Sequence, residues 1–214
     1  MKSSVIQINS NRSPFIIAEM SGNHNQSLER ALEIVDAAAA AGAHAIKLQT
    51  YTADTMTLAL DEEEFFISDP KSLWVGQSMH ALYGQAYTPW DWHAPIMERA
   101  RNKGLVCFSS PFDESAVDFL DSLDVPAYKI ASPELMDIPL IDYVARKGKP
   151  VIMSTGLATL ADIELAVDTC RAVGNNEIIL LKCTSAYPTP LDEVDLLTIP
   201  NLKSTFDVEV GLSD

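Results

Sequence analysis

Short apolar segments alternate with amphipathic segments along the chain, which is the pattern of β-strands joined by helices. Seven apolar segments have strand length: residues 15–20, 45–49, 105–109, 127–131, 150–154, 178–183 and 208–212. Segments with apolar residues at helical spacing lie between them: residues 28–41, 78–86, 90–103, 114–123, 138–146 and 159–173. Ser27 can cap the first of these helices, and Gly42 can end it. This order predicts parallel strands in an α/β fold.

The regular repeat of strand and helix favours an eight-stranded α/β barrel over an open, doubly wound sheet. No Gly-x-Gly-x-x-Gly follows the first strand, so a dinucleotide-binding fold has no support. We find seven barrel strands before Asp214 and therefore expect an incomplete (β/α)8 TIM-type barrel. Residues 5–8 predict a further short strand in an N-terminal hairpin. We interpret residues 1–214 as one partial barrel domain of a truncated chain.

The connection between the second strand and residue 89 is unusually long for a βα connection. Residues 61–64 form an acidic run within it, and aromatic residues follow. The segment could cover a site, but for the acidic run itself we favour a solvated surface.

Three strand segments contain a lysine among apolar or small residues: Lys47, Lys129 and Lys182. Lysine is rarely buried unless it is paired or functional. Strand alternation places Gln49 on the face of Lys47, and Thr184 on that of Lys182. At matched depth in one sheet, the three ammonium groups would converge and suit a doubly charged or phosphorylated anion. The alternative is that the lysines extend outward to solvent, which helices covering the sheet disfavour.

Polar residues cluster where most strands end, and this is where barrel enzymes place their sites. The candidate site residues are Glu19, Asn23, Lys47, Gln49, Ser110, Lys129, Ser132, Glu134, Ser154, Ser185, Tyr187 and Ser213.

The chain has 214 residues, of which 47% are hydrophobic, and a formal net charge of −15. This charge argues against a nucleic-acid or membrane-surface partner, although a few focused lysines can still bind an anion. The N-terminus lacks the apolar segment of a signal peptide. Cys107, Cys170 and Cys183 lack metal-binding or redox spacing, so we expect reduced thiols in a cytoplasmic protein.

These strand ends resemble the sialic acid synthase family over essentially the whole chain, most closely its pseudaminic branch. Segments at seven strand ends carry the resemblance: residues 15–25, 45–51, 108–113, 126–132, 150–156, 181–188 and 210–214. Residues 20–21, 51–56 and 87–90 favour the pseudaminic branch over the N-acetylneuraminate branch.

The resemblance implies that phosphoenolpyruvate condenses with an acetamido-sugar aldehyde and water, giving a nine-carbon 2-keto sugar acid and phosphate. In the pseudaminic branch the sugar is a 2,4-diacetamido-2,4,6-trideoxy-altrose; a synthase of N-acetylneuraminate or legionaminate is the alternative within the family. A divalent metal of the Mn or Mg type polarises the aldehyde. The family's two metal-binding histidines and its antifreeze-like domain would lie beyond Asp214. The resemblance also implies a homodimer for the full-length protein. Because the metal-binding histidines would lie beyond Asp214, it implies that the chain as given is inactive.

The resemblance also implies roles for the candidates. Lys47 and Lys129 would hold the phosphate and carboxylate, and Glu134 would activate water or stabilise a developing cation. Glu19 would orient a lysine or the sugar, or else only neutralise Lys47. Substrate binding would fall to a further set: Asn23, Gln49, Ser110, Ser132, Ser154, Ser185, Tyr187 and Ser213.

Two residues keep open roles. His24 would lie near the metal or be a hydrogen-bonded loop histidine, and Lys182 would be structural or replace a hydrogen-bond donor.

Two other classes of function remain. In a Schiff-base aldolase, Lys129 or Lys182 would attack a ketone. A non-catalytic fragment would bind phosphoenolpyruvate or associate through open sheet edges.

Overall fold

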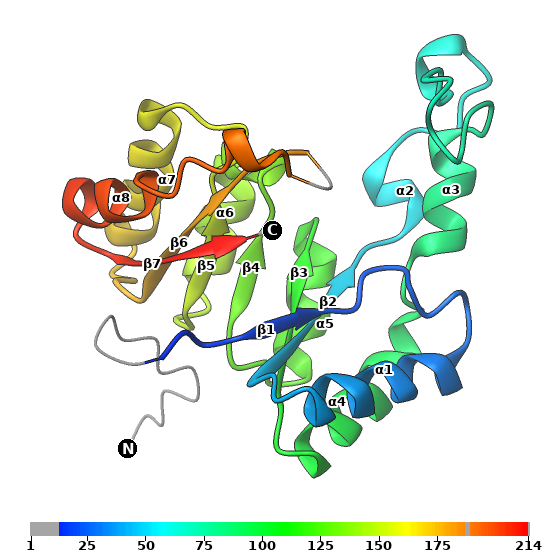
Figure 1. Ribbon diagram of the computed structural model, residues 1–214, viewed down its shortest axis with the longest axis horizontal. Coiled ribbons are helices and arrows are strands. Elements are labelled where there is room, and N and C mark those ends of the chain that lie inside the picture. The colour runs from blue at the N-terminus through cyan, green and yellow to red at the C-terminus, as the bar shows by residue number, and fades with distance from the viewer. Residues whose placement is uncertain (1–12, 187–188, 214) are drawn as a thin grey trace. The chain divides into compact units, whose positions relative to one another are not determined.

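The computed structural model describes residues 13–186 and 189–213. It has seven strands in these ranges, with helices between them, in the order of the incomplete (β/α)8 barrel that the sequence predicts (Figure 1). The chain divides into two compact units, residues 16–116 and residues 117–214 with 1–15. The predicted hairpin strand at residues 5–8 lies outside the described part of the chain, as does Tyr187.

The first unit contains three parallel strands, β1 (Ile17–Glu19), β2 (Ala45–Thr50) and β3 (Val106–Pro111). Helices α1 (Leu28–Ala40) and α4 (His93–Asn102) lie side by side (Figure 1) and pack against β2 and β3, respectively. The Ser27 hydroxyl caps α1 by accepting a hydrogen bond from the Arg30 N–H at 3.2 Å, as predicted.

The long connection of this unit contains short elements. They are α2 (Ala53–Met56), η1 (Glu63–Phe65), α3 (Met79–Ala86) and η2 (Trp90–Trp92). Helix α2 packs against α3, which begins one residue after the predicted start and ends at the predicted residue 86. Residues 61–64 are exposed, which confirms the solvated interpretation of the acidic run.

The second unit contains four strands, β4 (Tyr128–Ile130), β5 (Val151–Ser154), β6 (Ile178–Cys183) and β7 (Glu209–Ser213), and every neighbouring pair is parallel. Helix α5 (Glu114–Ser122), whose first three residues belong to the first unit, precedes β4. The other connecting elements are η3 (Pro133–Met136), α6 (Ile138–Ala145), α7 (Leu160–Ala172), η4 (Leu191–Glu193) and α8 (Thr198–Phe206). Helix α6 packs on α7, and α8 packs on β6 and β7 (Figure 1).

Helix α8 departs from the prediction, because the prolines near it indicated a loop. Pro200 is the third residue of α8. The N–H groups of a first helical turn have no partner within the helix, so proline costs nothing there. In the part of the chain that the structure describes, no helix combines the length and apolarity needed to span a membrane.

His93 is fully buried where α4 packs on the strands. Its Nδ1–H donates to the Pro89 carbonyl at 3.3 Å, and its Nε2 accepts from the Thr50 hydroxyl at 2.8 Å. The Ser109 hydroxyl in turn lies 2.6 Å from that of Thr50. Burial lowers the pKa of His93 from 6.5 to about 4, against a smaller opposing effect of the Pro89 carbonyl. The imidazole is therefore neutral in the folded chain at pH 7.

We expect this histidine to make the fold acid-sensitive. Between pH 6.5 and 4 the unfolded chain binds a proton at His93 that the folded chain excludes, so stability is complete above pH 6.5 and falls as the pH drops toward 4. The full loss is about 3 kcal/mol. Urea unfolding of the chain and of His93→Gln across this range measures it. The variant should lose less stability on acidification, and equal slopes would contradict the prediction.

Candidate functional site

Lys129 is 7% exposed and lies in the middle of β4. Strand register places it beside Ile152 of β5, which pairs with Ile179 of β6. Alternation then puts Ser154 on the same face, together with Cys183 and its partner in β7, Ser213. The opposite face carries Tyr128, whose hydroxyl contacts the Asp121 carboxylate of α5 at 3.4 Å. The candidate residues of β4, β5 and β7 thus share the face turned away from α5.

The convergence of three lysines is wrong for Lys182. Strand alternation puts Lys182 on the same face of β6 as Ile178. Ile178 pairs in register with Val151 of β5, and Val151 pairs with Tyr128 of β4, so this is the face opposite Lys129. Lys182 also lies three residues further along β6 than Ile179, so its depth does not match that of Lys129. Lys47 belongs to the other unit, and its approach to Lys129 stays a prediction.

Gly156, which follows β5, lies close to residues at the ends of β4 and β6, the strands on either side of β5. The Gly156 N–H donates to the Ser132 hydroxyl at 3.1 Å. A Cβ atom added to Gly156 would lie 2.7 Å from Ser185 Oγ and 3.2 Å from Cys183 Sγ. Only glycine permits so close an approach. The structure therefore brings Ser132 and Ser185 together, as predicted, and adds Gly156 and Cys183. The glycine after Ser154-Thr155 could have signalled this contact.

Two buried oxygens of this unit have no hydrogen-bond partner among the described residues, Ser154 Oγ and Glu134 Oε2. Ser154 is 1% exposed. A buried polar atom left unpaired costs roughly 1–3 kcal/mol, and such atoms are rare in folded proteins unless a ligand or water pairs them. Both atoms belong to predicted site residues, so we interpret them as positions that a ligand or water would satisfy.

Glu134 lies in η3, directly after β4. Burial raises the pKa of its carboxyl group above the ordinary value, and the positive charge of Lys129 partly offsets this effect. A glutamate whose pKa is raised toward neutrality is suited to proton transfer. Lys129 within β4 and Glu134 after it therefore place a buried positive charge and a proton acceptor close enough to interact.

Four candidates of the first unit also share a face. Glu19 pairs in register with Lys47, and the two side chains form an ion pair. Gln49 lies two residues beyond Lys47, on the same face of β2, and pairs in register with Ser110 of β3. Ser110 is 1% exposed, and its hydroxyl finds no partner within residues 13–186 and 189–213. The ion pair fits either role of Glu19, orienting Lys47 or neutralising it. The buried Ser110 hydroxyl is a further position that a ligand or water would satisfy.

Asn23 and His24, in the loop after β1, stabilise that loop with hydrogen bonds. Asn23 is exposed, and its Nδ2 donates to the Met20 carbonyl at 3.0 Å. His24 is buried; its Nδ1 accepts from the Gln26 N–H at 3.2 Å, and its Nε2 lies 3.1 Å from the Thr88 hydroxyl. Burial lowers the pKa of His24, which favours the neutral ring. Because both ring nitrogens are engaged, His24 is a hydrogen-bonded loop histidine.

The residues that the structure describes do not form a metal-binding site. No three histidine, cysteine, aspartate or glutamate side chains gather there in an arrangement that could hold an ion. We therefore derive no reaction step through a metal.

Comparison with known proteins shows one family. Residues 34–214 match the NeuB family. The chain is 47% identical to pseudaminic acid synthase of Campylobacter jejuni over 206 residues, which is 96% of this chain and 60% of that protein. It is 36% identical to N,N'-diacetyllegionaminic acid synthase of Legionella pneumophila, covering 94% of this chain and 57% of that protein. The chain thus spans about 60% of the length of the curated relatives that it matches.

A solved structure shows the same fold. The N-acetylneuraminic acid synthetase of Leptospira borgpetersenii, in complex with citrate, superposes with a TM-score of 0.83 at 31% identity. The match covers 98% of this chain and 69% of that chain.

Proposed function

The chain belongs to the NeuB family, and from that premise we propose that the protein it forms part of condenses phosphoenolpyruvate with an acetamido-sugar aldehyde and water. The products are a nine-carbon 2-keto sugar acid and phosphate. Since the chain spans about 60% of its relatives' length, the activity is proposed for the whole protein. For the 214-residue chain alone, we propose binding of phosphoenolpyruvate without turnover.

The observation that carries this proposal is the pairing of a buried cation with unpaired buried oxygens. Lys129 is 7% exposed, and Ser154 Oγ and Glu134 Oε2 lack partners in the described chain. A phosphate or carboxylate would accept a charge-assisted hydrogen bond from the ammonium and a further one from the serine hydroxyl. Phosphoenolpyruvate carries both groups, so it can use Lys129, Ser132 and Ser154 together.

The side chains supply binding and proton transfer. Carbon 3 of phosphoenolpyruvate attacks the aldehyde carbon, which leaves a cationic carbon 2. The aldehyde oxygen becomes an alkoxide. Water adds to carbon 2, and the Glu134 carboxylate takes one of its protons. The bond between carbon 2 and the phosphate oxygen then breaks, the remaining hydroxyl on carbon 2 becomes the keto group, and the two protons of the water end on the alkoxide oxygen and on the phosphate. Lys47 and Lys129 hold the acidic groups of the substrate, with Ser110, Ser132, Ser154, Ser185 and Ser213 as neutral donors. Glu19 orients Lys47, Gln49 and Tyr187 bind the sugar, and Asn23 contributes to substrate binding.

The sugar that we propose is a 2,4-diacetamido-2,4,6-trideoxy-altrose, which would make the product pseudaminic acid. Identity is 47% to a pseudaminic acid synthase and 36% to a legionaminic acid synthase, and this difference favours the pseudaminic branch. A divalent ion of the Mn or Mg type, a homodimer and a further C-terminal domain also remain proposals for the whole protein.

Phosphate release tests the proposal. The whole protein, supplied with phosphoenolpyruvate and Mn²⁺, should release phosphate only when the altrose derivative is added, and mass spectrometry should detect the nine-carbon acid. N-acetylmannosamine, the precursor of N-acetylneuraminate, is the comparison sugar. Sugar-independent phosphate release, or a borohydride-stable adduct of pyruvate on Lys129, would contradict the proposal; the adduct would indicate a Schiff-base aldolase.

A further inference from the structure

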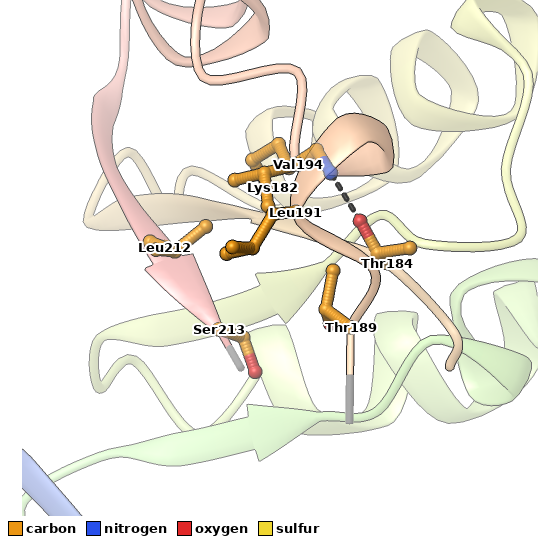
Figure 2. Close-up of a pocket in the computed structure, with 7 residues that line it drawn as sticks. All are labelled: Lys182, Thr184, Thr189, Leu191, Val194, Leu212 and Ser213. Carbon is orange, nitrogen blue, oxygen red and sulfur yellow. Dashed lines mark hydrogen bonds between the residues drawn. The ribbon is translucent and has the colours of Figure 1, made fainter. Parts of the chain in front are cut away.

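Lys182 belongs to a second pocket, on the other face of the sheet from Lys129. It pairs in register with Leu212 of β7, and alternation puts it with Leu180 and Ile178 rather than with Cys183. Figure 2 shows the pocket beside η4, the short helix that follows the β6 exit loop. The proposed substrate site therefore does not use this lysine.

The charge of Lys182 is buried against neutral oxygens. The residue is 7% exposed. Its Nζ donates to the Thr184 hydroxyl and to the Glu193 carbonyl oxygen at 3.5 Å (Figure 2 draws the first of these). Among the described residues, no carboxylate pairs with this ammonium. Two of its three N–H donors form these hydrogen bonds, and the third has no acceptor in the described part of the chain. A buried charge is costly unless an opposite charge compensates it, so the environment calls for an anion.

A cavity of about 90 Å³ adjoins this ammonium. Lys182, Thr184, Thr189 and Ser213 line its polar side, and Leu191, Val194 and Leu212 line its apolar side. Figure 2 shows the side chains of Leu191 and Leu212 directed toward each other. This is several times the roughly 10–15 Å³ that a single water molecule needs, which leaves room for an anion of four to six heavy atoms with an apolar end.

We propose that this pocket binds a small monocarboxylate, of the size of acetate or pyruvate. The carboxylate accepts a charge-assisted hydrogen bond from Lys182, and the methyl group contacts Leu191, Val194 and Leu212. A single ammonium balances one negative charge, which favours a monoanion over phosphate. The proposal does not rest on the proposed function: Ser213 is the one lining residue that also belongs to the proposed substrate site, and the contacts argued for the carboxylate and the methyl group do not use it.

A chemical-shift titration of the ¹⁵N-labelled chain with sodium acetate, and then with pyruvate, tests this pocket. Sodium chloride keeps the ionic strength constant. We expect saturable shifts at residues 182–184, 191–194 and 212. Lys182→Met should weaken binding by more than about tenfold, since it removes the buried charge. Lys129→Met should leave these shifts unchanged, which separates this pocket from the substrate site.

A second variant keeps the test decisive if Lys182→Met fails to fold. Leu212→Phe retains the ammonium and fills the apolar end of the cavity, and it should also weaken acetate binding. Thermal melts followed by circular dichroism report whether each variant is folded. Linear shifts without saturation, or equal affinity in the wild type and in a folded Leu212→Phe variant, would overturn the proposal.

Discussion

Replacing Lys129 with methionine is expected to abolish binding of phosphoenolpyruvate, with a loss of affinity of about a hundredfold or more. The ammonium is 7% exposed, so water screens its attraction to an anion weakly, and the loss of a buried charged partner costs roughly 2–5 kcal/mol. Methionine keeps the unbranched apolar stem, so the core around β4 should remain packed. Calorimetric titration of phosphoenolpyruvate into the 214-residue chain measures the change.

The matched control is Lys149→Met in the same unit. The Lys149 ammonium pairs with Asp121 and Asp124 at the surface, at 3.4 and 3.0 Å, and exposed ion pairs contribute little. This variant should bind phosphoenolpyruvate as the wild type does. If a folded Lys129→Met chain also binds normally, Lys129 does not anchor the anion and the proposed function loses its main support.

Replacing Glu134 with glutamine in the whole protein is expected to lower kcat by about 10²- to 10⁴-fold and to change KM little. Glutamine preserves the shape of the side chain but cannot accept the proton of the attacking water. The wild-type enzyme needs the ionised carboxylate, so its rate should fall as the pH drops through the pKa of Glu134. Because burial raises this pKa, the acidic limb should lie above the ordinary range of glutamate, about 4.3.

The pH–rate profile separates this role from a purely structural one. In Glu134→Gln, the residual activity should lose the acidic limb of the profile. Glu177→Gln is the control, because Glu177 is exposed and precedes β6 instead of following a strand. Its rate and profile should match those of the wild type. An unchanged acidic limb in Glu134→Gln would assign the titration to another group.

Local physical chemistry made much of the fold readable from the sequence. Strand β6 spans residues 178–183, as predicted, and Ser27 caps α1, as predicted. Such elements depend on apolar periodicity and on caps within a few residues of one another. Family membership was readable for a related reason, since the residues that carry it stand at strand ends in chain order. Helix α8 was missed because Pro200 signals a break unless the start of the helix is known.

The site required information that is not local. Strand alternation places Lys182 relative to its own neighbours, but only the register with β5 and β4 shows that it lies opposite Lys129. Ser132, Gly156 and Ser185 follow three different strands, and their approach depends on how those strands pair.

Burial likewise follows from packing. The unpaired Ser154 oxygen and the raised pKa of Glu134 exist because neighbouring elements exclude water from these groups. The sequence by itself thus determined which residues stand at the strand ends and which family they resemble. Only the tertiary structure decided which of them share a face and lie out of water, because pairing and desolvation join residues that are far apart in the chain.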